Sequence, residues 1–255
     1  MRKRLALLLA WPLLAGPAMA DEPAECQVAQ HQIEPAFTLP HVAAAIAAKK
    51  LPILVVGAGS SVLPGSNGAK AAYPARLQSA LQERLPGVAV TVTSDVKSKR
   101  TAAEMAKTLA ADLAQTKPVL LIWQTGTFDA MQGVDQDQFT QALDQGINAA
   151  RSAGADVILI NAQYSPRTES MIALSTYADI MRQVALQHEL PLFDRFEIMK
   201  LWADLGTFDL TSAPNKLDIA VRIHNCIGWL LADLMDEAVK EGGAQSAVGK
   251  PGAGN

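Results

Sequence analysis

Five short apolar runs constrain the fold of this chain more than any other feature. They are rich in Val, Leu and Ile and occupy residues 53–56, 88–92, 119–123, 157–160 and 190–193. A strand with one solvent-exposed face alternates apolar and polar residues. A continuous apolar run of this length is instead typical of a strand in a sheet that is buried on both faces. The sequence therefore predicts five strands with cover on both sides.

Segments with apolar residues at helical spacing separate and follow these runs, at residues 73–85, 102–113, 139–153, 171–188 and 217–239. Regular alternation of strand and helix predicts right-handed crossovers and a parallel sheet. We therefore expect the α/β class: one three-layer α/β/α domain over residues 46–240, doubly wound and flavodoxin-like, with a five-stranded parallel sheet. In such folds ligands bind beyond the carboxyl ends of the strands.

The first 20 residues have the pattern of a cleaved secretory signal. Three basic residues at positions 2–4 precede an apolar run over 5–14, and small residues end the segment at 18–20. The apolar run is too short to span a bilayer. We expect a periplasmic or secreted protein with no stable membrane anchor after cleavage, an N-terminal arm over residues 21–45, and a disordered Gly- and Ala-rich tail over 241–255.

The charge balance argues against two classes of partner. Without the three basic residues of the signal, 19 Lys and Arg remain against 25 Asp and Glu, a formal charge of −6. Nucleic acid and anionic membrane surfaces both require clustered positive charge. We therefore expect neither as a partner.

The chain has two cysteines, Cys26 in the arm and Cys226 in the last helix. An oxidising compartment permits a disulfide between them, and two buried free thiols are the alternative that spacing alone leaves open. No cluster of His, Cys, Asp or Glu has the spacing of metal ligands in the sequence. We expect no metal and no organic cofactor.

The turn after the first strand carries the strongest chemical signal. Residues 57–65 read Gly-Ala-Gly-Ser-Ser-Val-Leu-Pro-Gly. Glycine permits a sharp turn, and a serine there presents a hydroxyl that can attack a carbonyl. A nucleotide-binding loop is disfavoured because Val62 occupies the third position of the dinucleotide fingerprint and no Gly-Lys-Ser/Thr ending follows. A tight structural loop is the other alternative.

Residues 59–65, followed by Tyr-Pro-Ala-Arg-Leu at 73–77, resemble the first block of the GDSL/SGNH hydrolase family in an exported bacterial variant. Trp-Gln-Thr-Gly-Thr at 123–127 resembles the third block, and Gln-Tyr-Ser-Pro at 163–166 resembles the segment after the fourth strand. The similarity extends from about residue 51 to about 234. It implies the SGNH hydrolase fold and a serine hydrolase that cleaves an ester or acyl group from a small-molecule or carbohydrate ester substrate.

The resemblance also implies roles for single residues. Ser61 matches the nucleophile, with Ser60 as a one-residue alternative. His224 would accept the proton of Ser61, and Asp218 would orient the imidazole. The backbone amide of Ser61, with Gly126 or Gln124, would hold the oxyanion of the reacting carbonyl.

Three further residues complete the candidate oxyanion and substrate-binding set. Thr127 could supply a substitute hydrogen-bond donor, and Asp129 lies in the same segment after the third strand. Arg167 could clamp an anionic substrate group at the mouth of the cleft, or it could be a solvated cap.

The chain departs from the family pattern in three places. The glycine of the second block falls on residues 97–100, which include Lys99, the asparagine of the third block falls on Phe128, and residues 209–218 lack the histidine of the Asp-x-x-His block. Loss of one oxyanion donor costs about a hundred- to a thousandfold in rate. The alternative function is therefore a catalytically inactive SGNH-fold protein that binds a carbohydrate or envelope component.

The position of the last helix decides between two interpretations of His224. If the helix begins after His224, the imidazole could reach Ser61 as a general base. If the helix begins near Leu217, His224 is an ordinary polar residue of that helix.

Overall fold

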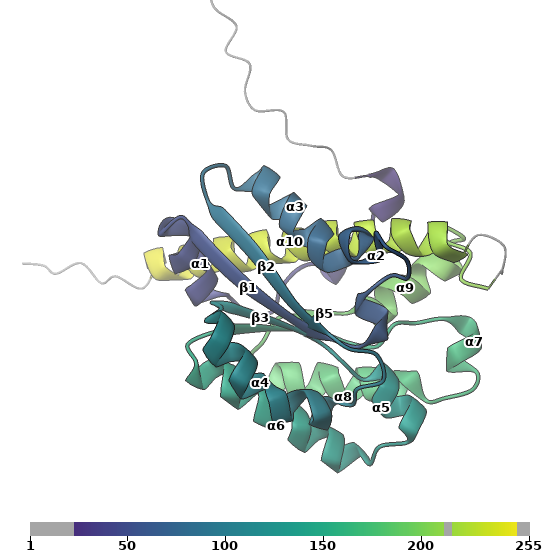
Figure 1. Cartoon of the computed structure of the whole chain (residues 1–255). Coiled ribbons are helices and arrows are strands. Elements are labelled where there is room, and N and C mark those ends of the chain that lie inside the picture. The colour runs from purple at the N-terminus through teal and green to yellow at the C-terminus, as the bar shows by residue number, and fades with distance from the viewer. Residues whose placement is uncertain (1–22, 212–215, 249–255) are drawn as a thin grey trace, which may run out of the picture.

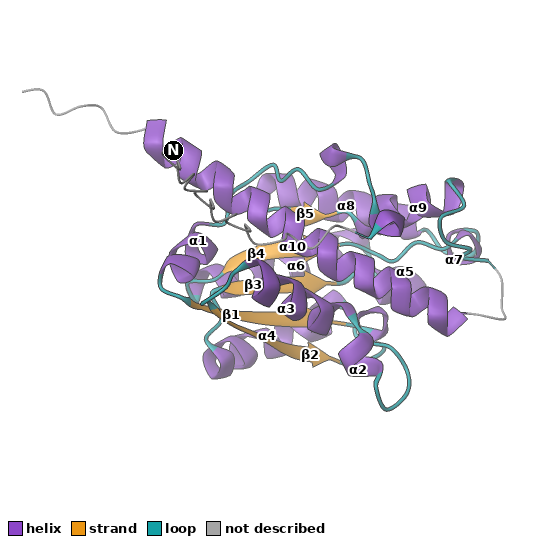
Figure 2. Ribbon diagram, turned by 90° about the horizontal axis from the view of Figure 1, so that it is seen from above, coloured by secondary structure: helices purple, strands orange, loops and turns teal. Residues whose placement is uncertain are grey.

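The computed structural model describes residues 23–211 and 216–248, with side chains of the last helix described as far as Lys240. Five parallel strands form one sheet in the order β2-β1-β3-β4-β5 (Figures 1 and 2). Their bounds are β1 Lys50–Gly57, β2 Ala89–Val96, β3 Leu120–Gln124, β4 Asp156–Ile160 and β5 Leu192–Phe193. The predicted α/β class and the predicted five-stranded parallel sheet are confirmed.

Helices cover both faces of the sheet (Figures 1 and 2). One face carries α4 (Ala102–Thr116), α6 (Gln136–Ser152) and α8 (Leu174–Gln187). The other carries α1 (Pro40–Ala47), α3 (Tyr73–Arg84) and α10 (Lys216–Val248). The remaining helices are α2 Gly68–Ala71, α5 Thr127–Gln132, α7 Pro166–Glu169 and α9 Arg195–Asp204, with 3-10 turns at Ala24–Cys26, Gln30–Gln32 and Gly59–Ser61.

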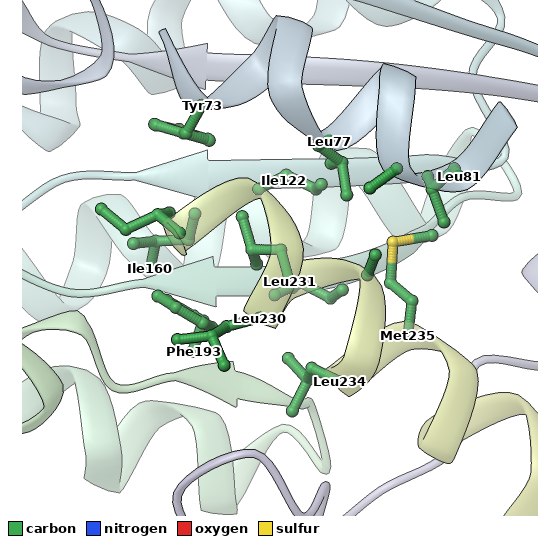
Figure 3. Close-up of a cluster of buried hydrophobic side chains, with 14 of the residues drawn as sticks. Tyr73, Leu77, Leu81, Ile122, Ile160, Phe193, Leu230, Leu231, Leu234 and Met235 are labelled. Carbon is green, nitrogen blue, oxygen red and sulfur yellow. The ribbon is translucent and has the colours of Figure 1, made fainter. Parts of the chain in front are cut away.

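The alternation of side chains along each strand divides the core into two layers. In β1, Ile53 and Val55 point to the α3 and α10 side, while Leu54 and Val56 point to the α4 and α6 side. Both sets are fully buried, as expected for a strand without a wet face. Figure 3 shows the first layer, in which α3 and α10 enclose side chains of β3, β4 and β5.

The N-terminal arm is packed into the domain. Cys26, Leu39 and Val42 lie fully buried in the first core layer. The predicted disulfide is present and joins Cys26 to Cys226 of α10. The expected arm is therefore part of the core, and its last residues form α1.

The ends of the chain differ in part from the expectation. Helix α10 continues to Val248, beyond residue 239 where the apolar pattern ended. The expected signal segment and the end of the expected tail, residues 249–255, lie outside the described residues. In the described ranges, no helix is both long enough and apolar enough to cross a bilayer.

Candidate functional site

A buried polar cluster lies at the carboxyl ends of the strands, where the fold places ligand sites. We call it the serine cluster. It combines side chains from the turn after β1, the start of α3, the end of β3, the loop after β4, the start of α9 and the third turn of α10. Its members are Ser60, Ser61, Tyr73, Gln124, Gln163, Arg195 and His224.

Ser61, the expected nucleophile, is buried, with 1% of its surface exposed, and it borders a cavity between the turn after β1, α2, α3 and β2. Its hydroxyl donates to Oε1 of Gln124 and accepts from the Tyr73 hydroxyl at 3.3 Å. Its backbone N–H donates to the carbonyl of Ala58 at 2.9 Å. Both the hydroxyl proton and the amide expected in the oxyanion hole are therefore already engaged.

Gln124 bridges the two serines. Its Oε1 accepts from Ser61, and its Nε2 donates to Oγ of Ser60. Ser60 is half-buried, and its carbonyl accepts from Nη1 of Arg195 at 2.9 Å. Gln124 thus fixes the serine turn, with its Oε1 and one of its two Nε2 hydrogens engaged by the two serines.

His224 lies in the interior of α10, because that helix begins at Lys216. Its Nδ1 accepts from the backbone N–H of Tyr73 at 3.0 Å. Burial and the positive charge of Arg195 lower the pKa of His224 to about 3, so the imidazole is neutral at pH 7. A neutral imidazole has one lone pair, and here the Tyr73 amide uses it. In the described part of the chain, His224 makes no hydrogen bond to Ser60 or Ser61.

Asp218 does not orient this imidazole. The two residues are six positions apart on one helix, which places them about 120° apart around its axis. The Asp218 side chain is exposed, whereas His224 is buried. The expected Ser61–His224–Asp218 arrangement is therefore not assembled. The helix begins before His224, which fixes the imidazole inside the helix instead of in a loop near Ser61.

Three other candidates hold loops together at the end of β3. The N–H of Gly126 and the hydroxyl of Thr125 donate to Oδ2 of Asp129 at 3.2 and 3.1 Å. Oδ1 of Asp129 accepts from the N–H of Ala102, the first residue of α4, at 2.8 Å. Oγ1 of Thr127 accepts from the backbone N–H of Gln163 at 3.3 Å. Burial raises the pKa of Asp129. These groups connect the segment after β3 to the start of α4 and to the loop after β4.

Arg195 is a member of the cluster that was not among the expected site residues. Its side chain is fully buried, with Nη1 on the Ser60 carbonyl and Nη2 on Oε1 of Gln163, both at 2.9 Å. Burial lowers the pKa of Arg195 to about 10 and raises that of Tyr73 to about 12. Its position directly after the last strand, in the segment 194–196, was the only sequence signal for it.

A model of the non-GDSL lipase-like family matches residues 25–241. The chain belongs to this family. Comparison with curated proteins finds no match.

Solved structures similar to this non-GDSL lipase-like protein have the same fold. TesA is 23% identical, with a TM-score of 0.55 over 71% of this chain and 99% of TesA. A mutant acetylxylan esterase from Geobacillus stearothermophilus is 17% identical, with a TM-score of 0.56 over 74% and 93%. A lipase/acylhydrolase from Enterococcus faecalis is 18% identical, with a TM-score of 0.54 over 70% and 96%. The GDSL/SGNH resemblance and its fold are confirmed.

Proposed function

We propose that this non-GDSL lipase-like protein recognises an ester-bearing small molecule or carbohydrate at the serine cluster, as an exported protein. Family membership supports ester chemistry as the general function. Two of the similar structures are named as an acetylxylan esterase and a lipase/acylhydrolase, which supports a ligand with an ester or acyl group. The buried disulfide supports an oxidising compartment.

The geometry favours recognition over turnover by Ser61. One observation carries this conclusion: the Ser61 proton is donated to Gln124, while the lone pair of His224 is used by the Tyr73 amide. A serine nucleophile needs an adjacent base that can take its proton as the carbonyl is attacked. We therefore assign Ser61 and Gln124 to the architecture of the binding site.

Ester hydrolysis through Ser60 is the second candidate. Ser60 is half-exposed, and its Oγ accepts from Gln124 Nε2 instead of donating to it. In the described hydrogen bonds the Ser60 hydroxyl proton has no acceptor, so this candidate requires a base that takes the proton during attack on the ester carbonyl. This candidate needs no rearrangement of Ser61.

A fluorophosphonate probe, with the label located by mass spectrometry, tests the assignment. We expect no adduct on Ser61, because an unactivated buried hydroxyl does not attack phosphorus. An adduct on Ser60 would establish the second candidate, and an adduct on Ser61 would refute our assignment. Recognition is tested separately by calorimetric titration of the protein with acetylated and with deacetylated xylotriose. Equal heats with no saturation for either ligand would refute ester recognition.

A further inference from the structure

We infer that the cavity beside the serine cluster binds an organic anion, with its carboxylate or phosphate facing Arg195. The inference deepens the proposed function by naming the charge of the ligand. The cavity measures about 340 Å³ and lies between the loop after β4, α9 and the start of α10. Its polar lining includes Gln163, Arg167, Arg195, Lys216 and His224.

The charge of Arg195 is not balanced by the described protein. Its guanidinium is fully buried and forms no ion pair with a described carboxylate. Its two hydrogen-bond acceptors, Ser60 O and Gln163 Oε1, are neutral, and its Nε has no partner. Burying a charge costs several kcal/mol unless an opposite charge compensates it. A bound anion in the adjoining cavity would supply that compensation.

The other charged side chains that line the cavity are also mostly positive. Arg167 and Lys216 are exposed at its lining, and neither pairs with a described carboxylate. Asp209 is the only acidic residue among the described lining residues, and its Oδ1 accepts from both the N–H and the hydroxyl of Thr211. Three cations thus face one engaged carboxylate, and such a cleft concentrates anions.

The cavity also fits the carbon part of a ligand. Met199, Leu210 and Ile223 contribute apolar side chains to the lining, which we call the apolar wall. Arg195 connects the cavity to the serine turn through the Ser60 carbonyl. An organic anion can therefore place its charge near Arg195 and its carbon atoms against the apolar side chains of the lining.

Calorimetry at low salt tests the inference with three probes: inorganic phosphate, galacturonate and galactose. Galacturonate and galactose differ in one carboxylate, so we expect saturable binding of phosphate and galacturonate and none of galactose. The double variant Arg167→Gln/Lys216→Gln keeps every buried contact, and we expect it to weaken anion binding at least tenfold. Lys200→Gln, an exposed charge of α9 outside the cavity, should leave binding unchanged.

The outcomes separate this inference from the proposed function. The inference is overturned if neither anion saturates the protein, or if the double variant and Lys200→Gln bind anions equally well. Arg195→Gln provides a second variant, and if it folds, anion binding should be lost. Failure of the proposed function would appear differently, as anion binding without any recognition of an acetylated ligand.

Discussion

At the scale of single residues, the chemistry of the site depends on which lone pairs are free. Tyr73 contributes twice, since its amide occupies His224 Nδ1 and its hydroxyl donates to Ser61. Gln124 Oε1 accepts the single hydroxyl proton of Ser61. The sequence indicated Ser61, Gln124 and His224 as members of one site. It could not indicate their roles, because those depend on Tyr73, which is 151 positions from His224.

The buried imidazole predicts a pH dependence of stability. The pKa of His224 is about 3 in the folded protein and about 6.5 when the chain is unfolded. As the pH falls, the unfolded chain binds this proton first. The stability that the folded protein has with a neutral His224 is therefore fully present above pH 6.5, and it is lost as the pH falls toward 3. At about pH 5 the free energy of unfolding should be about 2 kcal/mol lower than at pH 7 from this group alone.

Urea unfolding of His224→Gln at both pH values measures this contribution. Glutamine retains an acceptor for the Tyr73 amide but does not titrate, so the difference between the two pH values should shrink by about 2 kcal/mol. His31→Gln, at an exposed position, is the matched control and should behave like the wild type. An unchanged difference in His224→Gln would show that the imidazole is not buried and neutral.

At the scale of elements, the apolar runs located all five strands, whereas some helices were missed. The expected cover on both faces is wrong for the edge strand β2, in which only Val90 is buried. Strands β1 and β3 are continuous apolar runs, and both of their faces are buried. Helix α1 was missed because its Ala-rich sequence has little contrast between faces. Helix α9 was missed because it begins only two residues after β5, so its apolar residues follow those of the strand almost without a break.

Close packing of α6 on the sheet predicts the effect of Gly146→Ala. A Cβ at Gly146 would lie 2.2 Å from the ring of the fully buried Trp123. Alanine in a helix gains up to about 1 kcal/mol over glycine, but overpacking of a core costs about 1–3 kcal/mol. We expect a net loss of about 1–2 kcal/mol in the free energy of unfolding, measured by urea denaturation.

Gln145→Ala on the exposed face of the same helix is the control. It introduces the same residue with a smaller change in helix propensity and no new core contact, so its stability should change by less than about 0.5 kcal/mol. A Gly146→Ala variant with a higher free energy of unfolding than the wild type would contradict this prediction. It would show that α6 can move away from Trp123 of β3 without loss of stability.

At the scale of the whole molecule, one covalent link closes nearly the entire described chain. Cys26 and Cys226 are 200 positions apart and both fully buried. Closing a loop of that length lowers the entropy of the unfolded chain by an amount worth up to about 5 kcal/mol. Cys26→Ser should therefore lower the free energy of unfolding by several kcal/mol, most of which a reductant should reproduce in the wild type.

The variant Cys26→Ser/Cys226→Ser provides the control for reduction. Its unfolding midpoint in urea should not respond to dithiothreitol, whereas the wild-type midpoint should fall. Equal midpoints for oxidised wild type and the double variant would show that the link adds nothing to stability. The sequence predicted this pairing only as one of two alternatives, because the fold alone brings the arm to α10.

The central claim is that the serine turn of this esterase-like fold binds without using Ser61 as a nucleophile. Hydrolysis of p-nitrophenyl acetate by the wild type, Ser61→Ala and Ser60→Ala tests it most directly, with kcat/KM as the readout. We predict that wild type and Ser61→Ala differ by less than about twofold, since removing a working nucleophile costs about 10⁴-fold or more. A loss of that size in Ser61→Ala, with Ser60→Ala still active, would contradict the account.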